Sequence, residues 1–144
     1  MNLKDVAARA VNVMHRTLFR VSGGRVGGNL FDMPVVKLTT TGRKTGEPRT
    51  VMLTSPTSHD GNPVLVASYG GDDRHPAWFQ NLRANPDVEV TFDGATKPMR
   101  ARVATAAERE QLWPEVTGKY KGYAQYQTRT DREIPLVILE PPSA

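Results

Sequence analysis

The hydrophobic pattern of the chain changes after its first 28 residues. Within residues 3–21, apolar side chains recur at helical spacing while the arginines lie mostly on other faces, which predicts a basic amphipathic helix. Four glycines within residues 22–28 predict that this helix ends in a flexible joint. From Pro34 onward, short β-type runs alternate with turn signals. We therefore expect one domain over residues 1–144, with the helix and joint at 1–28 and a mainly β unit at 29–141.

The β-type runs predict six strands, at residues 35–40, 49–55, 63–69, 88–92, 98–103 and 134–140. Asp93-Gly94, between the fourth and fifth runs, is a two-residue hairpin signal, and Asp60-Gly61 helps to turn the second strand into the third. These signals indicate an antiparallel sheet. Six short strands avoid open edges when they curl into a barrel, so the expected fold is α+β, mainly β.

Two helices are expected between the strands. One covers residues 75–84, with Pro76 in its first turn and Asn85-Pro86 at its end. The other begins at a capping box formed by Thr105 and Glu108, and we expect Pro114 to break or kink it. Both helices would flank the barrel.

Charge and composition exclude several classes of protein. The net charge is +4, but residues 1–28 carry five basic residues against one acidic residue, and the remainder is balanced. A nucleic-acid-binding surface is therefore not indicated. The chain has no cysteine, no apolar run long enough to span a membrane and no secretory signal, so we expect a cytoplasmic protein. The basic helix either packs on its own domain, contacts the inner face of the plasma membrane peripherally, or covers a substrate site.

The strongest chemical signal is the sequence T-T-T-G-R-K-T-G-E-P-R at residues 39–49. Its two glycines allow backbone N–H groups to converge on an anion, its threonines (residues 39, 40, 41 and 45) add hydroxyls, and Arg43, Lys44 and Arg49 add positive charge. Such a loop suits a phosphate or a carboxylate. An ordinary charged hairpin turn explains the same residues equally well.

Two further groups of residues have a functional and a structural interpretation. The run A-S-Y-G-G at residues 67–71 ends a predicted strand, where the glycines would allow a ligand close to the backbone and Trp78 would cover a flat ring. Tyr120, Tyr123 and Tyr126 step by three, so on one helix they would share a side and line a pocket. In the alternative interpretation, Trp78 and the tyrosines only pack in the core.

Several reaction classes lack their apparatus in this sequence. The three histidines have no metal-ligand spacing, and no G-x-S-x-G motif is present, so we expect neither a metal site nor a hydrolytic nucleophile. If the protein is an enzyme, a bound organic cofactor must carry its reaction.

Five segments together resemble the deazaflavin-dependent nitroreductases of actinobacteria. They are L-T-T-T-G-R-K-T-G-E-P-R (38–49), V-A-S-Y-G-G (66–71), H-P-A-W-F-Q-N-L-R-A-N-P (75–86), W-P-E-V-T-G-K-Y-K-G-Y-A-Q-Y (113–126) and T-D-R-E-I-P-L-V-I-L-E-P (130–141). The resemblance implies a split β-barrel, related to oxidoreductases that bind flavin mononucleotide (FMN). It also implies that the cofactor is the reduced deazaflavin coenzyme F-420, which carries a phosphodiester and a polyglutamate tail.

The resemblance assigns roles position by position. Phosphate or tail would be held by Arg43, Lys44, Thr45 and Arg49, and the deazaflavin would lie beside Thr50, Val51, Met52 and Thr54. The groove would be completed by Val66, Ala67, Ser68, Tyr69, Ala77, Trp78, Asn81 and Tyr123. The candidates for the catalytic hydrogen-bond donor are Ser68, Tyr120, Tyr123 and Tyr126.

The implied reaction is hydride transfer from reduced F-420 to an electron-poor conjugated acceptor, such as a quinone, an enone, an unsaturated lactone or a nitroaromatic. Better-known members often carry proline and an aromatic residue where this chain has Met52 and Thr54, and lysine where it has Tyr69. The resemblance therefore does not assign a particular substrate to this chain. The alternatives are an FMN-binding split-barrel oxidoreductase and a non-catalytic carrier of deazaflavin or a lipophilic ligand. We expect a monomer, because the N-terminal helix would cover the barrel flank through which other split barrels dimerise.

Overall fold

The computed structural model describes residues 29, 30 and 33–142. The predicted N-terminal helix and its glycine joint lie outside these residues. The described elements, in chain order, are β1 (Asn29–Leu30), β2 (Met33–Thr41), β3 (Pro48–Thr54), β4 (Thr57–His59), β5 (Asn62–Val66), the 3-10 helix η2 (Tyr69–Gly71), α2 (Ala77–Ala84), β6 (Asp87–Phe92), β7 (Ala95–Val103), α3 (Ala106–Lys119), α4 (Gly122–Thr128) and β8 (Leu136–Glu140).

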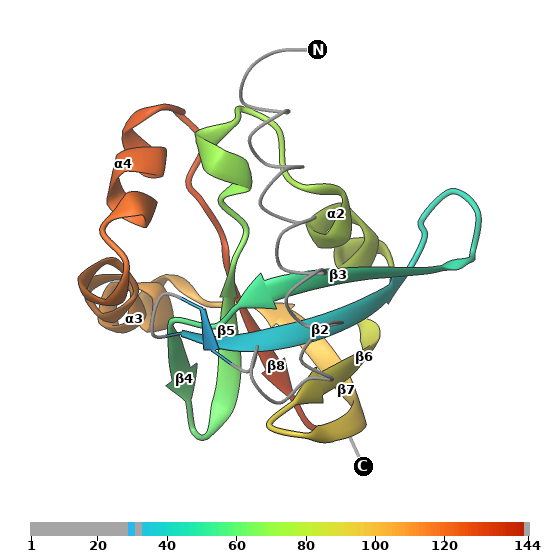
Figure 1. The fold of residues 1–144 in the computed structure, drawn as a ribbon. Helices are drawn as coiled ribbons and strands as arrows, with labels where there is room; N and C mark the ends of the chain where they lie inside the picture. The colour runs from blue at the N-terminus through green and yellow to red at the C-terminus, as the bar shows by residue number, and fades with distance from the viewer. Residues whose placement is uncertain (1–28, 31–32, 143–144) are drawn as a thin grey trace.

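The strands form one antiparallel sheet in the order β1-β2-β6-β7-β8-β5-β4, and β3 pairs with β2. The sheet confirms a mainly β antiparallel fold, in which α3 and α4 lie together on one side and α2 lies near the β2–β3 hairpin (Figure 1). All six predicted strands are present, and β1 and β4 are additional. The prediction missed β4 because its three residues, T-S-H, show no apolar alternation.

The two Asp-Gly turns are confirmed as hairpin turns. Asp93 and Gly94 have φ of 53° and 78° and join β6 to β7, with Phe92 opposite Ala95. Asp60 and Gly61, with φ of 52° and 79°, join β4 to β5. The second turn therefore closes the hairpin of the short additional strand and does not lead directly from β3.

The strand predicted over residues 63–69 ends earlier, at Val66. Tyr69, Gly70 and Gly71 have φ of 47°, 64° and 82°, and a β-strand cannot continue through three left-handed residues. A Cβ atom at Gly71 would lie 2.7 Å from the carbonyl oxygen of Tyr126, so glycine is required where η2 approaches α4. The backbone thus turns from β5 towards the helices instead of extending the sheet.

Two apolar clusters fill the two sides of the central strands. Along β8, Val137 and Leu139 join the cluster beneath α2, whereas Leu136 and Ile138 join the cluster beneath α3 and α4. This alternation follows from the two-residue period of a strand, and each buried aliphatic side chain contributes about 1.5–3 kcal/mol. The helices on both sides are therefore fixed to one shared strand.

The predicted capping box at the start of α3 is confirmed. The Glu108 N–H donates to Thr105 Oγ1 (3.2 Å) and the Thr105 N–H donates to Glu108 Oε1 (2.8 Å). The expectation that Pro114 breaks the helix is wrong, because α3 continues to Lys119. Pro114 and Glu110 are both exposed, so the Glu110 carbonyl that loses its helical donor can bind water.

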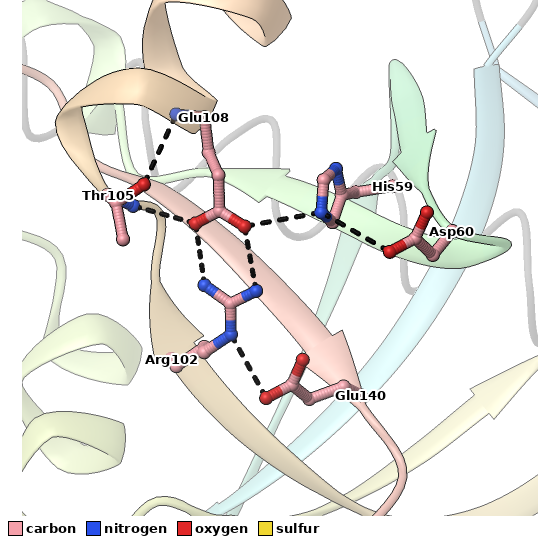
Figure 2. A network of polar contacts seen from close by, with 6 residues as sticks. All are labelled: His59, Asp60, Arg102, Thr105, Glu108 and Glu140. Atoms are coloured by element: carbon pink, nitrogen blue, oxygen red, sulfur yellow. Dashed lines mark hydrogen bonds and ion pairs between the residues drawn. The ribbon is translucent and has the colours of Figure 1, made fainter.

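Glu108 also joins α3 to the sheet through the polar network in Figure 2. Arg102 donates to both of its carboxylate oxygens (2.7 and 2.8 Å) and to Glu140 (3.0 Å), and His59 lies 3.2 Å away. The Arg102 guanidinium, followed by the Thr105 N–H, lowers the pKa of Glu108 to about 2. Residues of β4, β7 and α3 thus meet at the Glu108 carboxylate, and Arg102 links it to Glu140 on β8.

We expect Glu108→Gln to lower the melting temperature by about 4 °C at pH 7. The substitution removes the negative charge that binds Arg102 and the Thr105 N–H, and this charge contributes about 1 kcal/mol to the free energy of unfolding. A depressed carboxyl pKa contributes stability above its unfolded value near 4.3, and this contribution is lost as the pH falls towards 2. Thermal melts from pH 7 down to pH 2 should therefore converge for the two proteins. Glu110→Gln, on an exposed face of α3, is the control, and a pH-independent difference for Glu108→Gln would contradict the assignment.

Candidate active site

A groove of about 930 Å³ lies between the β2–β3 hairpin and α2. Ten of the residues that the resemblance assigned to the cofactor line it, and they are Arg43, Lys44, Thr45, Arg49, Thr50, Val51, Met52, Ala77, Trp78 and Asn81. The volume is large enough for a small-molecule cofactor. The structure therefore brings the basic loop, β3 and α2 together around one space.

The basic loop is a compact hairpin loop between β2 and β3. The Gly46 N–H donates to the Gly42 carbonyl (2.8 Å), and the Gly42 N–H donates to the Glu47 carbonyl (2.8 Å). These bonds turn the backbone so that residues 43–46 are exposed at its tip. Not all of the threonine hydroxyls that we expected to bind an anion are available, because the Thr39 hydroxyl is hydrogen-bonded to the Thr50 hydroxyl within the hairpin (2.9 Å). The cations at the tip are therefore its main means of binding an anion.

Asn81 on α2 fixes the position of this loop. Its Oδ1 accepts from the backbone N–H of Arg43 (3.2 Å) and from the Arg43 guanidinium (2.9 Å). Its Nδ2 donates to Thr40 Oγ1 (3.2 Å), and the side chain is only 4% exposed. A buried amide whose donors and acceptors are used in this way holds α2 and the hairpin at a set separation. These hydrogen bonds of Asn81 thus set the width of the groove between α2 and the hairpin.

The charges at the tip are available to a ligand. Lys44 makes no hydrogen bond or ion pair with any residue in the described part of the chain. Arg49 lies 3.7 Å from Glu47 in a pair exposed to solvent, which contributes little. Farther along β3 the lining becomes apolar at Val51 and Met52, and Trp78 faces it from α2. A charged tip followed by an apolar wall suits an elongated ligand with an anionic end and a flat, less polar end.

The position of Trp78 is compatible with both interpretations of this residue. It is 6% exposed and belongs to the apolar cluster beneath α2, as the structural interpretation expected. It also lines the groove, as the functional interpretation expected. A buried indole that presents part of its surface to a groove provides a wall of fixed position.

Three groove residues were not among the predicted site residues, namely Lys37, Gly42 and Pro48. Lys37 lies opposite Met52 in the β2–β3 register. A single lysine within a strand gives no signal of its own in the sequence, and only the pairing places its charge in the groove. Gly42 was recognised as part of the loop but not as a lining residue.

The other predicted site residues do not line the groove, and they are Thr54, Val66, Ala67, Ser68, Tyr69, Tyr120, Tyr123 and Tyr126. Val66 and Ala67 are buried in the two apolar clusters. Ser68 is buried next to η2, where Tyr69 adopts its left-handed conformation. Residues 66–69 thus lie where the chain turns from β5 towards α4.

The three tyrosines form a cluster, although not on one helix as predicted. Tyr120 ends α3, and Tyr123 and Tyr126 lie on α4, because the helix breaks at residues 120 and 121. Their ring centroids are nevertheless 5.1 to 6.4 Å apart. Burial raises the pKa of Tyr123, and burial followed by a hydrogen bond with Tyr120 raises the pKa of Tyr126 to about 12. Both phenols therefore remain protonated donors at neutral pH.

β3 connects the groove to the tyrosine cluster. Met52 and Thr54 are two residues apart on a strand, so their side chains point to the same face. Thr54 Oγ1 lies 3.2 Å from the Tyr123 hydroxyl. One strand thus leads from the charged tip, past the apolar wall, to the phenols.

In residues 29–30 and 33–142 no three His, Cys, Asp or Glu side chains gather as metal ligands. No helix of this part of the chain is long and apolar enough to cross a membrane.

Comparisons with known proteins identify related sequences and structures. An F420H(2)-dependent quinone reductase of Mycobacterium tuberculosis is 40% identical over 134 residues, which cover 88% of this chain and 87% of the relative. The structure of an F420-H2-dependent reductase, FDR-A, is 44% identical with a TM-score of 0.66, covering 74% of this chain and 94% of that one. Another solved relative is 40% identical with a TM-score of 0.68, and the match covers 89% of this chain and 96% of that one. It is described as a domain-swapped dimer.

A more distant structure shares the fold alone. It is a protein of the pyridoxinephosphate oxidase family from Clostridium acetobutylicum, 15% identical with a TM-score of 0.51, covering 88% of this chain and 84% of that one. The profile of a single family, by contrast, matches residues 12–141, nearly the whole chain. The protein is therefore a member of the F420H(2)-dependent quinone reductase family.

Proposed function

We propose that this protein is an oxidoreductase that transfers a hydride from reduced F-420 to a quinone or a similar conjugated acceptor. The observation that carries the proposal is the groove, because its cationic tip and apolar wall match the two parts of this coenzyme. Membership of the F420H(2)-dependent quinone reductase family supports the same cofactor. The split-barrel form of the sheet is part of the proposal, and it extends the antiparallel sheet described above.

The basic loop would bind the phosphodiester and the glutamate tail. Arg43, Lys44 and Arg49 are exposed around the tip of the hairpin, where carboxylates of a flexible tail can reach them. Asn81 keeps the Arg43 backbone and guanidinium in place, so less ordering is required when the anion binds. Lys37 adds a further cation inside the groove, next to Met52.

The apolar wall would hold the deazaflavin ring. Val51 and Met52 on β3 and Trp78 on α2 all line the groove, and both elements are fixed by the core beneath them. When bound, the reduced ring supplies the hydride. The residues around it restrict its position and exclude water from one face, which favours transfer to an acceptor over loss to solvent.

The tyrosine cluster would bind the acceptor. Because Thr54 joins Tyr123 to the end of β3, the phenols lie at the continuation of the apolar wall. A protonated phenol can donate a hydrogen bond to an acceptor oxygen as negative charge develops there. Ser68, at the end of the neighbouring β5 segment, is a second candidate donor.

Two associations remain proposals. We expect the chain to be a monomer, and a peripheral membrane contact through the N-terminal helix is one alternative for that helix; both depend on residues 1–28, outside the described part. One related structure is a domain-swapped dimer, so the oligomeric state of this chain has to be measured directly.

The test is a binding titration followed by a turnover assay. Purified protein is titrated with F-420 and with FMN, and reoxidation of reduced F-420 is then followed after addition of menadione or an enone. We expect binding of F-420 and acceptor-dependent reoxidation. Binding of FMN without F-420 would overturn the proposal, and F-420 binding without turnover on any acceptor would instead indicate a carrier.

A further inference from the structure

Arg132 makes an unusual set of contacts near the site. It lies in the segment that precedes β8, and its guanidinium donates to the carbonyl oxygens of Ser68 (2.8 Å), Ala67 (3.2 Å) and Asp72 (2.8 Å). Its Nη1 also lies 3.2 Å from His75 Nδ1. Every one of these partners belongs to residues 67–75, the segment between β5 and α2. One side chain therefore binds this segment at four positions.

The segment that Arg132 holds needs an external support. Three consecutive residues in it, Tyr69 to Gly71, have positive φ, and Tyr69 is not glycine. A left-handed conformation of a non-glycine residue is costly and persists only where the surroundings impose it. The carbonyls on both sides of these residues are bound by the Arg132 fork. We conclude that Arg132 stabilises the turn that carries Ser68 and Tyr69.

Arg132 is in turn held by α4. The Gln127 side-chain amide donates to the Arg132 carbonyl (2.7 Å), and its oxygen accepts from the Ile134 N–H (2.9 Å). Gln127 lies one residue beyond Tyr126 on the helix that carries two of the three tyrosines. A continuous chain of hydrogen bonds thus runs from α4 through Arg132 to the segment that leads into α2.

We propose that Arg132 is a positioning residue that sets the separation between the tyrosine cluster on α4 and the segment 67–75 that leads to the groove wall. The inference rests on the proposed function, since that separation would fix how the acceptor meets the coenzyme. Arg132 itself touches neither of them. It acts through Ser68, Ala67 and Asp72, whose carbonyls it binds.

The guanidinium is suited to this role in a way that an ammonium is not. Its N–H groups form a rigid planar fork, so four acceptors are bound in one fixed geometry, whereas lysine presents three donors on a flexible stem. Arg132→Lys therefore keeps the charge and removes the fork. A small change in the separation between the tyrosine cluster and the segment 67–75 is enough to slow a reaction that depends on close approach of the acceptor to the coenzyme.

The experiment compares wild type with Arg132→Lys, using single-turnover mixing of protein loaded with reduced F-420 against menadione, and separate F-420 titrations. We expect the hydride-transfer rate to fall about tenfold while the dissociation constant for F-420 changes less than about threefold, because the basic loop is untouched. Arg102→Lys is the matched control, since it also removes a guanidinium fork, but in the network of Figure 2. It should lower stability without lowering the rate.

An independent readout is the titration of His75, measured by NMR. Burial and then the charge of Arg132 lower the pKa of His75, and Arg132 can only donate, so Nδ1 accepts and the neutral ring carries its proton on Nε2. In Arg132→Met the His75 pKa should rise towards its ordinary value. An unchanged His75 titration would show that the contact does not exist in solution.

The outcomes separate the two proposals. If wild type does not oxidise reduced F-420, the proposed function is wrong. If wild type is active and Arg132→Lys transfers hydride at the same rate, the positioning role is wrong. If Arg132→Lys does not fold, Gln127→Leu takes its place, because it releases the Arg132 segment from α4. An unchanged rate in Gln127→Leu would then overturn the inference.

Discussion

Replacing Arg43, Lys44 and Arg49 together with alanine is expected to weaken F-420 binding about 100-fold. A hydrogen bond to a charged group contributes about 1.5–3 kcal/mol, and exposure reduces this to roughly 1 kcal/mol for each cation. Since about 1.4 kcal/mol corresponds to a factor of ten, three cations give a factor near 100. The measurement is the dissociation constant from F-420 fluorescence titration.

The way in which the loss of F-420 affinity varies with tail length and with salt concentration tests whether the loop binds the glutamate tail. If the loop binds the polyglutamate tail, the loss should be larger for coenzyme with more glutamates. Interactions between exposed charges are screened over about 10 Å at 0.1 M salt, so the difference between wild type and variant should shrink as salt is raised. A variant effect that depends on neither tail length nor salt would exclude the proposed tail contact.

The control removes the same number of charges elsewhere. Lys97, Arg100 and Lys119 are exposed and do not line the groove, so their replacement by alanine lowers the net charge equally. We expect this control to bind F-420 within about threefold of wild type, since charges beyond a Debye length are screened. An equal loss in both triple variants would mean that only the overall charge attracts the coenzyme.

Local sequence signals predicted the parts of this fold that local chemistry determines. The turn at Asp93-Gly94 requires positive φ at both positions, and the capping box of Thr105 and Glu108 needs only residues on adjacent turns. The loop at residues 39–49 was identified for the same reason, because its glycines and cations are contiguous. Each of these features is complete within about a dozen residues.

The rest of the site depends on pairings that no local pattern encodes. Lys37 enters the groove only because the register places it opposite Met52. Asn81 fixes the loop across 38 residues of sequence, and Arg132 reaches back 60 residues or more to Ser68 and Asp72. The predicted end of the strand over residues 63–69 was wrong for this reason too, since the true end at Val66 is set by the Arg132 fork and by the contact of Gly71 with α4.

Tyr123→Phe is expected to lower the rate of acceptor reduction about 100-fold, with little change in F-420 affinity. Tyr123 is 7% exposed, and loss of a single preorganised donor to developing negative charge typically costs a factor of 100 or more. Burial raises the pKa of Tyr123, so its ionisation should not reduce the rate below about pH 10. Single-turnover rates from pH 6 to pH 10 test both statements.

Thr54→Val separates the chemical role of the phenol from its packing. Both variants remove the 3.2 Å contact between Thr54 and Tyr123, but only Tyr123→Phe removes the hydroxyl that would face the acceptor. Because a phenol has one proton, a Tyr123 that donates to the acceptor must accept from Thr54, and loss of that support should cost only about tenfold. If Thr54→Val slows the reaction as much as Tyr123→Phe, the contact merely holds α4 against β3. The hydrogen bond to the acceptor would then have to come from Tyr120, Tyr126 or Ser68.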